Sequence, residues 1–265
     1  MGATSRPAAG VATRRTGRLR RFWESTIGKK IVMAVSGAAG IGFVLLHMAG
    51  NLQMFMPTGA GAAMHTYAVN LRKLGALLWV ARVGLLAAVV LHVVAAVQLT
   101  ARNRDARPVA YSRRKSRVST LSSRTMRVGG FILVGFIVFH ILDMTVGVWH
   151  PRFTHLDPYN NLRIGLQRWW VALFYVISVV FLGLHLFHGA WASWRTLGLR
   201  RPGDRPLHRS IAIVLAVLIT LGMGAIPVAG ALGLFPEEPP PVPRESADVS
   251  LTERRAVVQR FEGEP

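Results

Sequence analysis

Residues 31–50, IVMAVSGAAGIGFVLLHMAG, contain no charged side chain and a single histidine, His47. A helix needs roughly 20 apolar residues to cross the hydrocarbon core of a bilayer, so this stretch by itself predicts a membrane span. The segment is expected to be helical, because backbone polar groups in lipid must be satisfied internally. It is too long, and begins too far from residue 1, to be a cleaved signal peptide.

Four further stretches have the same character, and they cover residues 74–99, 128–149, 169–192 and 210–235. The only arginine, lysine or acidic side chains inside them are Arg82 and Asp143. We therefore predict an all-α integral membrane protein with a bundle of five transmembrane helices over residues 31–235. A basic segment, residues 1–30, precedes the bundle, and a Pro- and acid-rich tail, residues 236–265, follows it and is expected to be disordered.

The charge of the chain is strongly basic and unevenly distributed, with 32 Lys and Arg against 12 Asp and Glu. The basic residues form blocks between uncharged runs, which indicates a membrane protein rather than a nucleic-acid-binding protein. The segments before the first span, between the second and third, and between the fourth and fifth carry 22 of the 32. Because Lys and Arg mark cytoplasmic segments, the N-terminus is expected in the cytoplasm and the C-terminus outside.

The chain has no cysteine. This excludes disulfides, thiolate-bound iron–sulfur clusters, Cys zinc sites and covalent c-type haem attachment. Any metal must be bound by His, Met, Asp or Glu, or lie inside a cofactor.

Five histidines lie within the predicted spans: His47, His92, His140, His185 and His188. An ionisable side chain in a bilayer is costly and is a functional candidate by default. An interhelical hydrogen bond explains one such histidine more easily than a set distributed over four helices. At ~1.5 Å per helical residue, His47 and His140 fall in the outer half of the membrane, and His92 and His185 fall in the inner half.

Two histidines on different helices at the same depth can bind a haem iron from both faces. The sequence therefore predicts two haem groups, one held by the outer pair and one by the inner pair. Zinc fits less well, since it needs three or four protein ligands in one place. His188 lies one helical turn from His185 and is an alternative ligand.

The sequence around these histidines also matches a known family. The matching stretches are STIGKKIVMAVSG (25–37), GFVLLHMAGNLQMF (42–55), VLHVVAAVQLTARNRDARPVAY (90–111), FHILDMT (139–145) and WVALFYVISVVFLGLHLFHGAWASWRTLG (170–198). Over about residues 23–200 the chain resembles the cytochrome b membrane-anchor subunit of bacterial succinate dehydrogenase and fumarate reductase, in its five-helix, two-haem form.

The resemblance implies that His47 pairs with His140, and His92 with His185, around two b haems. The family pattern H-x-x-[N/H]-G selects His185, although some relatives place the ligand where His188 stands. A flavoprotein subunit and an iron–sulfur subunit would dock on the cytoplasmic side of a bacterial cytoplasmic membrane. The electron acceptor would be a quinone, usually menaquinone, and succinate would bind elsewhere in the complex.

Further candidates surround the outer pair. Asp143 either accepts a proton during quinone chemistry or is simply hydrated at the interface. Arg82 either contacts a propionate of the outer haem or extends to the outer headgroups. Asn51 and Gln53 are weaker quinone-binding candidates. A loop glutamate that some relatives use near the outer quinone has no counterpart, because no acid occurs between Glu24 and Asp105.

The basic cytoplasmic segments suit an acidic docking partner or anionic lipid headgroups, or they set the topology and do nothing more. Other functions are compatible with the same pattern. Buried histidines with Arg82 and Asp143 would also suit a proton or ion transporter. The chain could alternatively be a haem-free structural anchor, or the haem b anchor of a formate dehydrogenase or hydrogenase.

Overall fold

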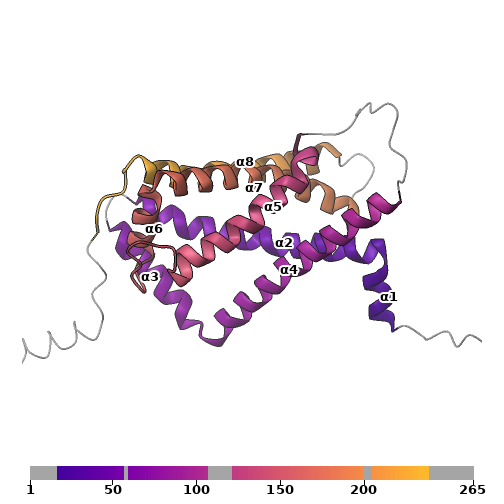
Figure 1. The fold of residues 1–265 in the computed structure, drawn as a ribbon, viewed down its shortest axis with the longest axis horizontal. Helices are drawn as coiled ribbons and strands as arrows, with labels where there is room; N and C mark the ends of the chain where they lie inside the picture. Colours follow the sequence, from indigo (N-terminus) through magenta and orange to yellow (C-terminus); the bar gives the residue numbers. More distant parts are fainter. Residues whose placement is uncertain (1–16, 57–58, 107–120, 200–204, 239–265) are drawn as a thin grey trace, which may run out of the picture.

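The computed structural model describes residues 17–56, 59–106, 121–199 and 205–238, and every regular element within these ranges is helical (Figure 1). Five helices are long and apolar enough to cross a membrane, so the predicted fold class is confirmed and the chain is a multi-pass membrane protein. These are α2 (Thr26–Asn51), α4 (Ala76–Asp105), α5 (Leu121–Ile141), α7 (Trp169–Thr196) and α8 (Arg205–Ala231).

The first span begins at Thr26 rather than at residue 31. Ser25 is its N-cap, and the serine Oγ accepts a hydrogen bond from the Gly28 amide at 2.8 Å. Such a cap satisfies one of the free N–H groups of the first turn, so the helix starts before the apolar run does. Part of the predicted N-terminal segment is therefore helical, while residues 1–16 lie outside the described residues.

Five shorter elements were not predicted from the sequence. Four of them lie outside the predicted spans, and one, a π-helix, lies inside the third predicted span, residues 128–149. They are α1 (Arg18–Glu24), η1 (Leu52–Phe55), α3 (Ala60–Lys73), η2 (Leu142–Val146, π-helical) and α6 (Pro158–Gln167). Figure 1 shows α3 and α6 together at one end of the bundle, which we call the capped end, and α1 at the opposite end. That opposite end, formed by α1, the start of α2 and the ends of α4 and α7, is the basic end.

Hydrogen bonds from two basic side chains to main-chain carbonyls hold α1 at the basic end. Arg102, near the end of α4, donates from Nη1 to the carbonyl of Glu24 at 2.6 Å. The ammonium group of Lys29 donates to the carbonyl of Trp23, and the lysine side chain is almost fully buried. Two cations are thereby used as hydrogen-bond donors to the end of α1, where helix carbonyls lack partners.

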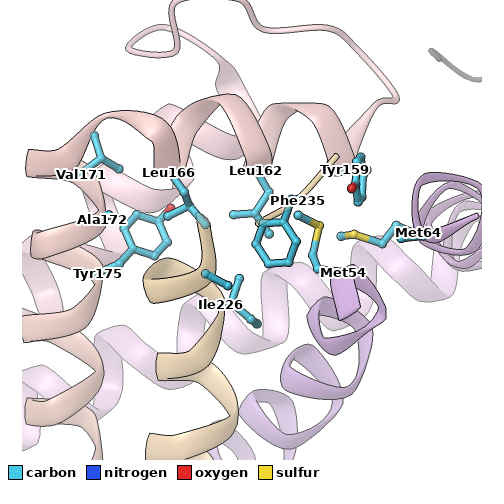
Figure 2. Packing of buried hydrophobic residues seen from close by; sticks show 12 residues of the cluster. Met54, Met64, Tyr159, Leu162, Leu166, Val171, Ala172, Tyr175, Ile226 and Phe235 are labelled. Carbon is cyan, nitrogen blue, oxygen red and sulfur yellow. The ribbon is translucent and has the colours of Figure 1, made fainter. Parts of the chain in front are cut away.

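The main core lies at the capped end, where α3, α6, α7 and α8 meet. Figure 2 shows the cluster, with Leu162 and Phe235 near the thioethers of Met54 and Met64. The side chain of Tyr159, within this cluster, is fully buried. The start of α6 follows standard capping chemistry, since Asp157 accepts from the Asn160 amide at 3.1 Å and a proline occupies the first turn.

The segment after α8 lies against α6. The hydroxyl of Tyr159 donates to the Pro236 carbonyl at 3.0 Å, and Asn160 Nδ2 donates to the Glu238 carbonyl at 2.9 Å. Arg163 also approaches Glu237, at 3.5 Å. The first three residues of the predicted tail, 236–238, are therefore placed against α6. Residues 239–265 lie outside the described part of the chain, and the disorder of the tail stays a prediction.

Candidate functional site

The first histidine pair joins α2 to α5. His47 lies near the end of α2 and His140 near the end of α5, and their ring centroids are 5.7 Å apart with an interplanar angle of 83°. Each ring is supported by an aromatic residue one turn earlier on its own helix. Phe43 stacks on His47 at 5.3 Å, and Phe136 stacks on His140 at 5.7 Å.

The second pair joins α4 to α7, nearer the basic end. The rings of His92 and His185 have centroids 6.0 Å apart and are tilted by 51°. In the described part of the chain no ring contact joins His188 to His92, although His188 lies one turn beyond His185. The structure thus brings His185, rather than His188, to the ring of His92.

Both pairs connect helices whose backbones are not closely packed. Within the described residues, α2 packs along α4 and α5 packs along α7, whereas α2 and α5, like α4 and α7, have no extended backbone contact. The imidazoles therefore reach toward each other across the interior of the bundle. With metal–imidazole bonds of roughly 2 Å and ring nitrogens about 1 Å from the ring centre, an iron bound by both rings needs centroids roughly 6 Å apart. Both observed separations, 5.7 and 6.0 Å, fit this requirement.

A serine holds one imidazole of the second pair. Ser36 Oγ lies 3.1 Å from His92 Nδ1 and 2.6 Å from the Val32 carbonyl. The adjacent Gly37 leaves room for the imidazole, because a Cβ there would stand 3.3 Å from His92 Cε1. The ring of His92 is consequently seated against α2 with its Nδ1 edge directed at the serine.

A tyrosine holds one imidazole of the first pair. The phenolic oxygen of Tyr175, on α7, is 2.8 Å from His140 Nδ1. Tyr175 is buried, and its ring packs edge-on against Phe136 at 4.8 Å and an interplanar angle of 88°. Neither Ser36 nor Tyr175 was predicted from the sequence, because a hydroxyl inside an apolar run shows no partner until the facing helix is known.

The other member of each pair is held differently. His185 Nδ1 is buried without a hydrogen-bond partner among the described residues. None of the hydrogen bonds within the described ranges involves the ring of His47, whose main-chain carbonyl accepts from Asn51 Nδ2 at 2.7 Å. These two imidazoles are oriented by packing, and their ring nitrogens are available to a ligand.

Asp143 lies in η2, three residues after His140, and is fully buried. Both of its carboxylate oxygens accept from Arg168 Nη2 at 2.8 Å. The same guanidinium donates to the carbonyls of Trp149 and Gly165, at 3.0 and 3.2 Å. The alternative that Asp143 is simply hydrated at the interface is therefore wrong, since a buried carboxylate needs a partner and here has one. The available signal for this ion pair was an acid inside one predicted span, Asp143, and an arginine immediately before the next span, Arg168.

Among the described residues, no hydrogen bond or ring contact joins the remaining predicted residues to the imidazole rings. Arg82 is exposed on α4, with its guanidinium carbon 5.2 Å from the ring centre of Trp79. Asn51 uses its amide to bond the end of α2, and Gln53 is half-buried in η1. The propionate role of Arg82 and the quinone roles of Asn51 and Gln53 stay predictions.

The fold and the site define a class: a five-span helical membrane protein with two interior histidine pairs, one toward each end of the bundle. Comparisons of the chain with protein-family models, with curated proteins and with solved structures find no significant match. The family resemblance read from the sequence therefore stays a prediction.

Proposed function

We propose that the chain is the membrane-anchor cytochrome b subunit of a succinate:quinone oxidoreductase, which passes electrons from an iron–sulfur subunit through two b haems to a quinone. The observation that carries this proposal is the geometry of the histidine pairs. Rings from helices that do not pack closely lie 5.7 and 6.0 Å apart, the separation that a shared iron requires.

His47 and His140 would hold the haem nearer the capped end, and His92 and His185 the haem nearer the basic end. The haem iron, when bound, supplies reversible one-electron chemistry. The chain would supply imidazole nitrogens to hold the iron, apolar surroundings and a fixed order of the two sites along the bundle. Phe43 and Phe136 would keep the first pair of rings from rotating away.

The basic end would face the cytoplasm, because it gathers the segments richest in arginine and lysine. A flavoprotein subunit and the iron–sulfur subunit would dock there, so electrons would enter at the His92–His185 site. This orientation, the bacterial cytoplasmic membrane as the location, and contacts of the basic segments with anionic lipid are parts of the same proposal.

Quinone, with menaquinone as the expected species, would react near the capped end. Asn51 and Gln53 lie there beside the end of α2, and Arg82 lies in the first two turns of α4. Asp143 would accept a proton only by giving up its ion pair with Arg168, which makes a direct role for this carboxylate costly.

The test is a haem measurement on the intact complex purified in detergent. The expected result is a reduced-minus-oxidised spectrum of the b type and two haems per anchor chain. His92→Ala should remove one haem, and His188→Ala, the matched control one turn from His185, should remove none. A chain without a b-type spectrum would instead be a transporter or a haem-free anchor. Loss of haem in His188→Ala but not in His185→Ala would reverse the assignment of the fourth ligand.

A further inference from the structure

In each histidine pair, a hydroxyl lies within hydrogen-bond distance of Nδ1 of one imidazole. The other imidazole of the pair has no such hydroxyl among the described residues. Ser36 contacts His92 in one pair, and Tyr175 contacts His140 in the other. We propose that Ser36 selects the Nδ1–H tautomer of His92, and that Ser36 and Tyr175 are positioning residues that set the electron-donating strength of Nε2 in their histidines toward a bound iron. This inference rests on the proposed function and deepens it.

A histidine binds a metal through a nitrogen that carries a lone pair, so the proton must sit on the other nitrogen. The group that accepts that proton in a hydrogen bond selects the tautomer, orients the ring and makes the ligand more basic. A residue that contacts Nδ1 can therefore control ligation without touching the metal.

At Ser36 the direction of the hydrogen bond follows from the neighbouring contact. The serine hydroxyl has one proton, which it donates to main-chain carbonyls of its own helix, at 2.6 Å from that of Val32 and 3.3 Å from that of Met33. The serine oxygen must then act as the acceptor toward His92 Nδ1, at 3.1 Å. His92 is consequently protonated on Nδ1, and its Nε2 presents a lone pair.

Tyr175 occupies the equivalent position in the other pair. Its hydroxyl oxygen is 2.8 Å from His140 Nδ1. The phenol cannot move away readily, since Tyr175 is a buried member of the capped-end cluster (Figure 2). Its ring also packs edge-on against Phe136 and Phe139. In the described part of the chain the phenol has no other hydrogen-bond partner, so its proton is directed at Nδ1 while Nε2 is unbound. With iron on Nε2, Nδ1 would carry the proton and the phenol oxygen would accept from it.

The two proposed haem sites should therefore differ in how strongly the histidine Nε2 donates electrons to iron. An alkyl hydroxyl that already donates to a carbonyl is a better acceptor than a phenol, because the donated proton polarises its oxygen. Nε2 of His92 should therefore be the stronger donor, which favours ferric iron.

The experiment compares Ser36→Ala and Tyr175→Phe with the native complex by redox titration of the haem spectrum and by electron paramagnetic resonance of the ferric haems. Each change removes one acceptor from Nδ1–H. We expect both haems to be retained, the potential of one haem to rise, and its resonance to shift, with the affected haem differing between the two variants.

Two variants serve as matched controls. Ser178→Ala removes a buried hydroxyl on α7 that has no hydrogen-bond partner among the described residues, and Tyr159→Phe removes a buried phenol that bonds the Pro236 carbonyl. In the described part of the chain neither hydroxyl hydrogen-bonds a histidine of the pairs, so neither change should move a potential. Equal shifts in the controls would overturn the inference.

Loss of haem in Ser36→Ala is also decisive when Ser36→Thr is measured beside it. Retention of both haems in the threonine variant supports the positioning role, because the hydroxyl is kept. Loss of haem in both overturns it. If native and variant potentials agree while two haems are present, the inference is wrong and the proposed function stands. If the native complex holds no b haem, the proposed function itself fails.

Discussion

The two histidine pairs lie in unlike surroundings. The pair at the capped end adjoins a packed core of α3, α6, α7 and α8, a buried ion pair and the bound residues 236–238. The pair nearer the basic end takes one histidine from α4, of which only Ala95 and Leu99 are buried. Among the long helices in the described part of the chain, only α2 packs closely against α4.

This difference indicates two ways to position a ligand in a membrane. At the capped end, interior packing and hydrogen bonds like those of a soluble protein hold the rings. On α4, the apolar surface faces lipid, which supplies no directional contact, so the ring of His92 depends on its neighbours on α2. Mutations in the first region should cost stability, and comparable mutations on α4 should cost little.

The largest effect is expected for Arg168→Ala. The change leaves the fully buried carboxylate of Asp143 without its cation, and removing one partner of a buried ion pair costs roughly 3–5 kcal/mol. Thermal unfolding of the detergent-solubilised protein should show a large drop in the midpoint. The double variant Arg168→Met/Asp143→Leu should recover most of it. An unchanged midpoint in Arg168→Ala would mean that the ion pair does not stabilise the capped end.

A glycine exchange compares the two regions directly. In Gly230→Ala a Cβ would stand 2.6 Å from Leu166 Cβ, inside the capped-end core. Overpacking of this kind costs about 1–3 kcal/mol. In Gly84→Ala, on α4, a Cβ meets nothing within 4 Å, so stability should be unchanged or slightly higher. Equal melting midpoints for the two variants would contradict the distinction between the regions.

Tyr159→Phe should have a smaller effect that depends on pH. The change removes the hydrogen bond to the Pro236 carbonyl, worth about 1 kcal/mol at neutral pH. Burial first, and then the charge of Glu238, raises the pKa of Tyr159 above its usual range. The protonated hydroxyl therefore stabilises the fold below about pH 10, and this contribution is lost as pH rises through the raised pKa.

The difference in melting midpoint between the native protein and Tyr159→Phe should accordingly shrink at alkaline pH. Midpoints measured in detergent from neutral pH to about pH 11 would show it. A difference that stays constant over this range would mean that the hydroxyl does not bond the segment after α8.

The smallest effect is expected for Arg82→Ala. Arg82 is exposed on α4 and its guanidinium lies over the ring of Trp79, an exposed cation–π pair worth about 0.5–1 kcal/mol at most. The melting midpoint should barely move. A loss as large as that of Arg168→Ala would show that α4 is held by more than its contact with α2.

Much of the fold could be predicted from the pattern of hydropathy along the sequence. Residues 31–50 and the four stretches like it gave five spans, because lipid admits only segments whose backbone groups are paired internally. The capped-end helices were missed, since α3 and α6 are short and mixed in polarity. For α6 a signal was present in the Asp157 cap followed by Pro158.

The candidate site divides in the same way. Depth along each helix placed His47 level with His140 and His92 level with His185, and the structure has these rings side by side. Depth could not reveal that Arg168 binds Asp143 or that Ser36 and Tyr175 contact the imidazoles. Those contacts depend on how each helix is rotated about its axis and which helix faces it.

The sequence by itself determined the number of spans, the clustering of basic residues and the level of each histidine, because hydropathy and a constant rise per residue act along one dimension. Only the tertiary structure decided which hydroxyl meets which imidazole and which cation meets Asp143. Such contacts depend on how the helices pack side by side. A small rotation of one helix about its axis changes which side chains face each other, and the apolar surfaces of the other helices would accept many such rotations equally well.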